Sequence, residues 1–134
     1  MEYRSLGRTN LKVSSLCLGT MTWGEQNDQA QAFAQIDRAK TAGINFIDTA
    51  EMYPVPPRPE TYATTEQYIG NYFQSRGDRA DWIIATKIAG PGNGITHIRD
   101  GQPRLNREQI RTALDNSLRR LQTDWIDLYQ LHWP

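Results

Sequence analysis

Short apolar runs alternate with amphipathic helical patterns along most of this chain, and this alternation restricts the fold. Strands are expected at residues 15–19, 44–48, 82–87 and 125–131, and helices at 28–41, 65–75 and 107–122. Three successive strand–helix–strand units predict a parallel sheet. If strand order follows sequence order, right-handed crossovers place every helix on one side of that sheet, as in the wall of a barrel.

Local signals support these boundaries. Gly43 and Gly77 stand where the first two helices should end. Thr64 with Gln67 resembles a capping box for the second helix, and Asn106 is placed to cap the third. Before the repeat begins, residues 3–6 and 11–13 flank a Gly-Arg-Thr-Asn turn, which predicts a β-hairpin within residues 1–14.

A barrel is favoured over a doubly wound sheet. The first strand is followed by Gly-Thr-Met-Thr-Trp-Gly at residues 19–24, which is not the G-x-G-x-x-G fingerprint of dinucleotide-binding sheets. A complete barrel takes roughly 250 residues. We therefore expect the 134 residues to form the N-terminal half of a (β/α)₈ barrel, with four parallel strands and three helices in residues 15–134. The chain would then be a fragment, a truncated product or the ordered part of a longer polypeptide.

Composition excludes several classes of function. Fifteen basic residues balance fifteen acidic ones, which argues against nucleic acid or an anionic membrane surface as the main partner. The single cysteine, Cys17, allows no disulfide within the chain and lies in an apolar run, so we expect a small buried strand residue. No leader-like segment or spanning apolar run is visible. We expect a soluble cytoplasmic protein.

Polar residues stand at three successive predicted strand ends, where parallel barrels carry their active sites. Asp48 ends the second strand and Tyr53 follows in its loop, while Lys87 and His132 end the third and fourth strands. Neighbouring strands lie about 4.8 Å apart, so these long side chains can converge. Singly, each residue has an ordinary structural explanation, such as an ion pair or a hydrogen-bonded strand end. Together they are chemically complementary.

The chemistry of such a group is proton donation to a carbonyl oxygen. A free phenol has a pKa of about 10, and roughly 4 kcal/mol of preference for the phenolate would bring that value near neutrality. One ammonium at about 4 Å supplies energy of that order at an effective dielectric of about 20. Lys87 could act in this way, with Asp48 as its counter-charge. His132 could donate a hydrogen bond that orients the carbonyl oxygen.

Two loops and one histidine allow weaker interpretations. The Gly-rich loop at residues 89–104 is either a mobile lid over the substrate or a plain flexible loop. The Pro-rich loop at 54–59 contains P-x-x-P, but a rigid loop beside a pocket is favoured over a polyproline ligand. His97 has no partner ligands nearby in the sequence, so no metal site is predicted.

Four segments together resemble the aldo-keto reductases. They read Leu-Gly-Thr-Met-Thr-Trp-Gly at residues 18–24, Gly-Ile-Asn-Phe-Ile-Asp-Thr-Ala-Glu-Met-Tyr at 43–53, Ala-Thr-Lys at 85–87 and Asp-Leu-Tyr-Gln-Leu-His-Trp-Pro at 127–134. The stretch at 51–61 is most similar to the Tas branch of NADP(H)-dependent members. The resemblance covers the whole chain but only the first half of the family's domain.

The resemblance implies a role for each matching residue. Asp48, Tyr53, Lys87 and His132 would form the catalytic tetrad, with Tyr53 as the general acid. Positions that would contact the nicotinamide half of NADP(H) are Gly19, Thr20, Met21, Gln26 and Asp48. Positions that would line the substrate pocket are Trp23, Tyr53, His132 and Trp133. Many relatives have Gly after the catalytic tyrosine, whereas this chain has Pro54, which would alter the loop but leave the tetrad intact.

The implied activity is NADP(H)-dependent reduction of small aldehydes or ketones by the full barrel. The residues that grip the rest of the cofactor come from later strands, so the missing C-terminal half would be an essential partner. Two alternatives stay open: a redox-sensing regulatory subunit, similar to potassium-channel β-subunits, and an inactive truncated product.

Overall fold

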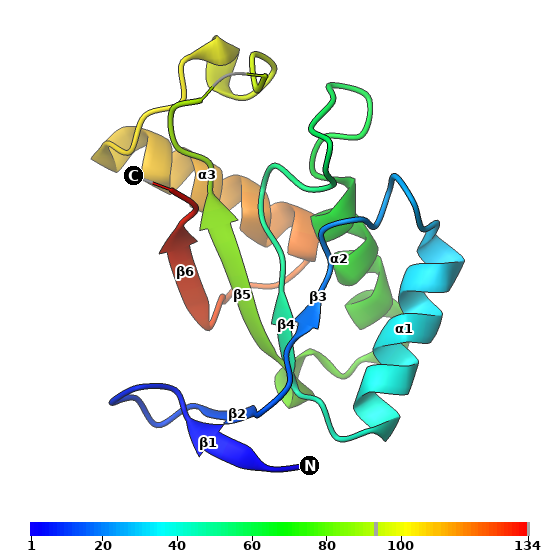
Figure 1. Ribbon diagram of the computed structural model, residues 1–134. Helices are drawn as coiled ribbons and strands as arrows, with labels where there is room; N and C mark the ends of the chain where they lie inside the picture. Colours follow the sequence, from blue (N-terminus) through cyan, green and yellow to red (C-terminus); the bar gives the residue numbers. More distant parts are fainter. Residues whose placement is uncertain (93, 134) are drawn as a thin grey trace.

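The computed structural model describes residues 1–92 and 94–133, and its main feature is one parallel sheet. The four strands lie side by side in chain order, as predicted (Figure 1). They are β3 (Leu18–Gly19), β4 (Phe46–Asp48), β5 (Ile83–Ile88) and β6 (Leu128–Leu131). A separate antiparallel hairpin joins β1 (Tyr3–Ser5) to β2 (Lys12–Ser14). The doubly wound alternative is excluded, because it requires the strand order to reverse.

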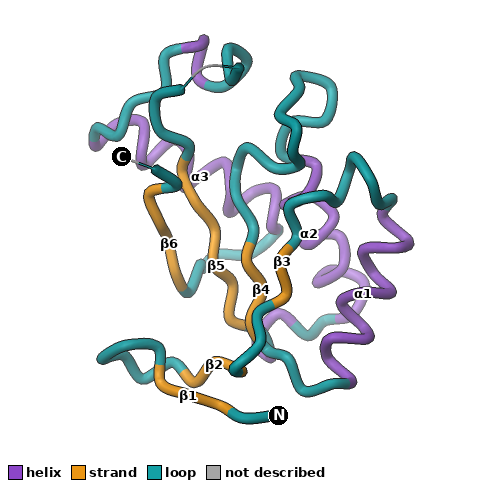
Figure 2. The backbone as a smooth tube through the Cα atoms, viewed as in Figure 1, coloured by secondary structure: helices purple, strands orange, loops and turns teal. Residues whose placement is uncertain are grey.

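Three α-helices cover one side of this sheet (Figure 2). They are α1 (Gln29–Thr41), α2 (Thr64–Arg76) and α3 (Arg107–Leu121), and two short 3₁₀ helices, η1 (Arg79–Asp81) and η2 (Arg99–Gly101), lie in the connections. Parallel strands in sequence order with helices on one side form a wall of a (β/α)₈ barrel. This is the predicted N-terminal half of that fold.

The helix ends show which capping predictions hold. Asn106 caps α3 by accepting a hydrogen bond from the backbone amide of Gln109, as expected. The capping box predicted for α2 is wrong. Its N-cap is Ala63, in the left-handed conformation and without a side-chain hydrogen bond. A tertiary contact at Thr65 explains part of this departure from the predicted cap. The Thr65 hydroxyl donates to the Trp23 carbonyl at 2.7 Å and so joins the start of α2 to the loop after β3.

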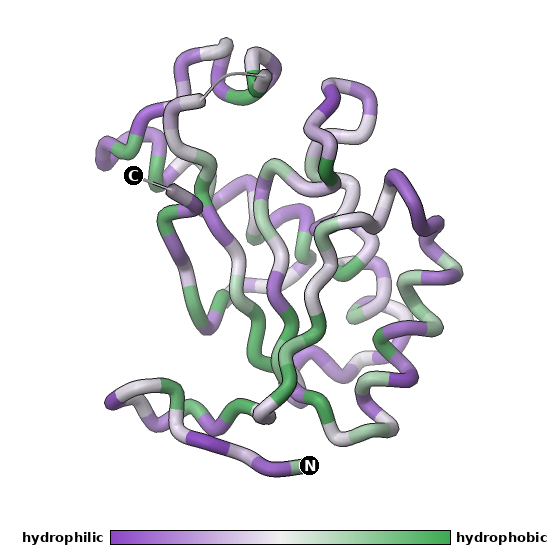
Figure 3. Tube along the Cα trace, viewed as in Figure 1, coloured by the Kyte–Doolittle hydropathy of each residue, from purple (hydrophilic) through white to green (hydrophobic). Residues whose placement is uncertain are grey.

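The main core lies between the sheet and the helices. Ile47 and Ile84, which are register neighbours of β4 and β5, are fully buried there against side chains from all three helices. Figure 3 shows the hydrophobic colouring concentrated in the lower parts of the central strands. Helix α2 approaches α3 most closely at Gly70, where a methyl group would overlap the Arg120 carbonyl oxygen.

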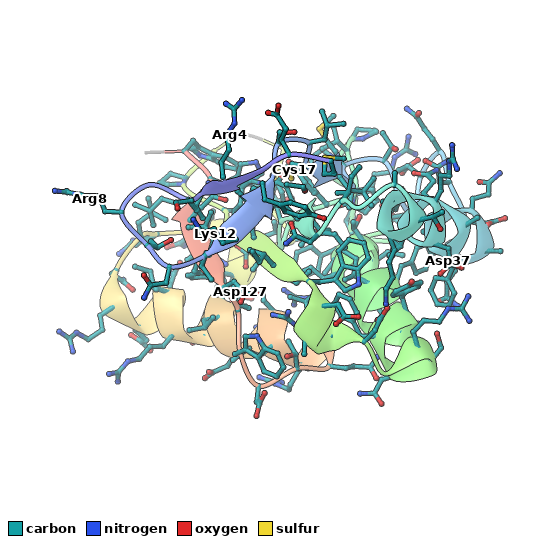
Figure 4. The ribbon with its side chains drawn as sticks, turned by 90° about the horizontal axis from the view of Figure 1, so that it is seen from below. Arg4, Arg8, Lys12, Cys17, Asp37 and Asp127 are labelled. Atoms are coloured by element: carbon teal, nitrogen blue, oxygen red, sulfur yellow. The ribbon has the colours of Figure 1, made fainter. Side chains whose placement is uncertain are left out.

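The hairpin lies across the N-terminal ends of the strands (Figures 1 and 4). Asn45, just before β4, connects the two sheets. Its side-chain oxygen accepts from the Ser14 amide at 2.8 Å, and its side-chain nitrogen donates to the Lys12 carbonyl at 2.9 Å. The opposite end of the parallel sheet, where the strands finish, is left to the longer loops.

The prediction that Cys17 is a buried strand residue is wrong. Cys17 is exposed, and its neighbour Leu16 is 59% exposed. The reason is that β3 is an edge strand of only two residues, so the segment before it has a paired neighbour on one side only. None of the described helices is both long and apolar enough to cross a membrane.

Candidate active site

The carboxyl ends of β4 and β5 bring Lys87 next to two of the predicted residues. The Lys87 ammonium donates to the Asp48 carboxylate at 2.7 Å and to the Thr49 carbonyl at 2.8 Å. The third neighbour is the Tyr53 hydroxyl, whose oxygen lies 3.5 Å from the Lys87 nitrogen. The Lys87 side chain is 12% exposed, so this charge lies in a partly desolvated position and is paired with a carboxylate.

Tyr53 is held in the loop directly after β4. Its side chain is only 7% exposed, and its amide donates to the Ala50 carbonyl at 3.1 Å. The Lys87 nitrogen also lies 4.9 Å from the centre of the Tyr53 ring. The phenol is therefore fixed beside an ammonium.

His132 completes the predicted group from the end of β6. Its ring centre lies 5.5 Å from that of Tyr53 in an edge-to-face arrangement, and its amide donates to the Ile88 carbonyl. Burial, and secondly the Lys87 ammonium, lowers the pKa of His132 below its ordinary value of 6.5. This lowering favours the neutral imidazole, which has one N–H donor to offer.

Trp133 forms a wall next to His132. Its indole N–H donates to the Pro91 carbonyl at 2.5 Å, and its ring centre lies 4.7 Å from that of His132. The indole lies against Gly90, where an added Cβ would come within 3.0 Å of the indole nitrogen. The glycine therefore permits the close contact between the loop after β5 and the end of β6.

The residues expected to contact a cofactor lie at different depths. Gly19 is the register neighbour of Asp48, and the buried Thr20 hydroxyl donates to the Asp48 carbonyl at 2.8 Å. Met21 is 48% exposed, and Gln26 is exposed in the turn before α1. Gly19 and Thr20 thus lie against Asp48, whereas Met21 and Gln26 are exposed.

Trp23 does not join the group. Its side chain is 1% exposed in the core between the sheet and α1, and its indole N–H donates to the Gln35 side chain at 2.9 Å. The structure therefore gives Trp23 a packing position rather than a place beside Tyr53 and His132. Among the described residues, no group of three metal-ligating side chains is close enough to hold a metal ion.

Sequence reasoning missed a buried ion pair beside Tyr53. Glu51 is 1% exposed, and both of its carboxylate oxygens accept from the Arg99 guanidinium at 2.6 and 2.7 Å. An acidic residue inside the otherwise apolar run at 50–52 was a usable signal, because buried carboxylates need partners. The partner lies 48 residues further along the chain, and no local pattern connects the two residues.

Comparison with known proteins identifies the family. The family model for the Aldo/keto reductase family matches residues 15–134. The chain belongs to this family. It is 56% identical to Protein tas of Escherichia coli, over 100% of the chain and 39% of that protein. It is 43% identical to the uncharacterized oxidoreductase YrpG of Bacillus subtilis, over 98% of the chain and 40% of that protein.

Solved structures agree with this membership. The aldo-keto reductase AKR11C1 of Bacillus halodurans, in its holo form, superposes with a TM-score of 0.77 at 36% identity. The match covers 98% of this chain and 40% of that aldo-keto reductase. The chain therefore spans about two fifths of the length of these relatives and forms the N-terminal part of their barrel.

Proposed function

We propose that a full barrel containing this aldo-keto reductase segment reduces small aldehydes or ketones to alcohols with NADP(H). The observation that carries the proposal is the contact of Tyr53 with Lys87, 3.5 Å between hydroxyl oxygen and ammonium nitrogen, with the Asp48 carboxylate on the same ammonium. The family and the relatives described as oxidoreductases support redox chemistry at this site.

Each residue contributes a separate part of the proposed reaction. Tyr53 transfers its hydroxyl proton to the carbonyl oxygen of the substrate and is left as a phenolate, which the Lys87 ammonium stabilises. Asp48 pairs with the Lys87 ammonium in its partly buried position and orients it. The neutral imidazole of His132 donates a hydrogen bond to the same carbonyl oxygen and orients it. Trp133 bounds the substrate on the side of β6.

The residues present fit one end of a nicotinamide cofactor. The Asp48 side chain is 31% exposed, so a polar group can reach its carboxylate from the mouth of the sheet. Thr20 holds the Asp48 backbone in place, and Met21 offers an exposed apolar surface next to it. When bound, NADP(H) would supply the hydride that the carbonyl carbon accepts. The remaining cofactor contacts are assigned to the rest of the barrel.

Substitution of Tyr53 tests the proposal. In the full-length protein, Tyr53→Phe should lower kcat for small aldehydes by about 10²-fold or more, because the proton donor is lost, while the Kd for NADPH stays within about twofold. Turnover is followed by NADPH absorbance and binding by fluorescence titration. Tyr68→Phe is a matched control, since Tyr68 is a partly buried tyrosine of α2 packed against the main core.

The other outcomes are equally informative. An unchanged kcat in Tyr53→Phe would remove Tyr53 from its role. Binding of NADPH by the wild-type protein without turnover of any aldehyde would favour the regulatory alternative. Mass spectrometry of the natural protein determines whether the polypeptide reaches barrel length.

We also propose a cytoplasmic location for the protein, which cell fractionation tests.

A further inference from the structure

The loop between β5 and α3 has a small apolar core of its own. Ile95 and Ile98 are 2% and 0% exposed, and they pack in one cluster with Met52 and Tyr53 from the loop after β4. The loop is thus docked on the segment that carries the proposed general acid. The sequence interpretations of this loop, a mobile lid or a plain flexible loop, did not include this packing.

Arg99 fastens the same loop by a set of hydrogen bonds. Its guanidinium donates to both carboxylate oxygens of Glu51, to the Ala89 carbonyl and to the side chain of Gln109 at the start of α3. The Arg99 side chain is 11% exposed. A planar guanidinium with several donors suits this arrangement, and a lysine could not reproduce it.

The backbone at this point is in an uncommon conformation. Arg99 and Asp100 are consecutive non-glycine residues with positive φ, 45° and 56°. Such residues persist where the surrounding contacts fix them. The contacts in question are those of the Arg99 side chain and of Ile98, which precedes it.

Glu51 carries the connection onward to the site. The Ala89 amide donates to its carboxylate at 2.6 Å, and the Glu51 amide donates to the Lys87 carbonyl at 3.1 Å. Glu51 therefore contacts the residues on both sides of Ile88, the last residue of β5, and it lies two residues before Tyr53. Burial raises the pKa of Glu51, and the Arg99 guanidinium opposes that rise.

A second buried pair of the same kind provides a comparison. Glu66 of α2 is fully buried, accepts from Arg120 of α3 at 2.7 Å and from the Thr86 hydroxyl at 2.6 Å. This pair joins two helices to the helix-facing side of β5. It matches the Glu51–Arg99 pair in burial and chemistry, but its members are placed on helices rather than on the loops at the mouth.

We propose that Arg99 is a positioning residue: through the buried carboxylate of Glu51 it locks residues 94–106 of the loop to the segment at 48–53, and so holds Tyr53 beside Lys87. This inference rests on the proposed carbonyl reduction. Arg99 acts through Glu51 and has no assigned contact with substrate or cofactor.

The experiment compares variants of the full-length protein in two measurements. Arg99→Met should lower kcat about 10- to 100-fold, because small displacements of reacting groups have effects of that size, with the Kd for NADPH within about twofold. Hydrogen exchange should accelerate at the amides of residues 51, 53 and 89, and this measurement does not depend on turnover. Arg99→Lys should behave like Arg99→Met. Arg104→Met is the control for the loop, since Arg104 is exposed and its guanidinium donates a long hydrogen bond of 3.4 Å to the Gln102 side chain.

Several results would overturn the proposal. These are a kcat for Arg99→Met within twofold of wild type, unchanged hydrogen exchange at residues 51, 53 and 89, or rescue of both measurements by Arg99→Lys.

Arg120→Met tests whether loss of any buried ion pair has the same effect. If Arg120→Met lowers kcat and accelerates exchange at the same three amides equally, the effect is a general loss of structure and the proposal is wrong. If Arg99→Met does not fold, Glu51→Gln, which keeps the side-chain shape, is expected to show the same paired changes, and wild-type behaviour would refute the inference. If the proposed function itself is wrong, the wild-type protein will turn over no aldehyde, which distinguishes that outcome from a failure of the Arg99 proposal.

Discussion

At the scale of single residues, the four side chains at strand ends could be read from the sequence because parallel strands finish at one edge. Asp48, Lys87 and His132 each stand at the end of an apolar run, Tyr53 follows in the loop after Asp48, and the structure brings the four together. The position of Trp23 could not be read in this way. It follows a strand end too, but the turn of its loop directs the indole to Gln35 of α1.

The ionisation of His132 gives a prediction at this scale. Burial and the nearby Lys87 ammonium both disfavour the imidazolium, so the midpoint of its titration should lie below 6.5. As the pH falls, His132 is therefore protonated in the unfolded chain before it is protonated in the folded protein. The free energy of unfolding decreases accordingly as the pH falls below 6.5. Nuclear magnetic resonance titration of labelled histidine, assigned with His132→Gln, checks the value. A midpoint above 6.5 would contradict the placement of the ring.

At the scale of secondary-structure elements, helix positions were predictable and their contacts less so. The Asn106 cap follows from local sequence alone. The capping box at Thr64 and Gln67 fails because the loop before α2 approaches the helix through Ala63 in a left-handed conformation. Local propensity does not include the tertiary contact of Thr65 with the loop after β3.

The contact of α2 with α3 gives a prediction for Gly70. An added methyl group would overlap the Arg120 carbonyl oxygen, and a backbone atom of a packed helix can move little. Gly70→Ala should therefore destabilise the protein by about 1–3 kcal/mol despite the better helix propensity of alanine. Chemical denaturation measures this change. Gln67→Ala, an exposed position of the same helix, should stay within about 0.5 kcal/mol of wild type.

At the scale of the whole molecule, strand order and helix placement were predictable from the alternating pattern and the handedness of crossovers. The exposure of the segment leading into β3 was not predictable in this way. The pattern at Leu16 and Cys17 is that of a buried strand, but burial there depends on a neighbour beyond the edge of this sheet. The apolar residue at the other edge, Leu131, is 57% exposed for the same reason.

The two open edges predict the behaviour of the 134 residues in isolation. The chain spans about two fifths of its relatives, so we expect it to bind NADPH too weakly for saturation at micromolar concentration. We also expect it to self-associate through its edge strands. Fluorescence titration and light scattering measure these properties. Micromolar affinity in a monomeric sample would show that the cofactor contacts are already complete.

The hairpin lies at the end of the sheet away from the proposed mouth, and its tip carries the exposed Arg8 (Figure 4). A cysteine introduced at position 8 could therefore tether the protein to a sensor chip without blocking the face that small molecules approach. Cys17 would first be replaced by serine, so that the linker attaches at one place on this segment.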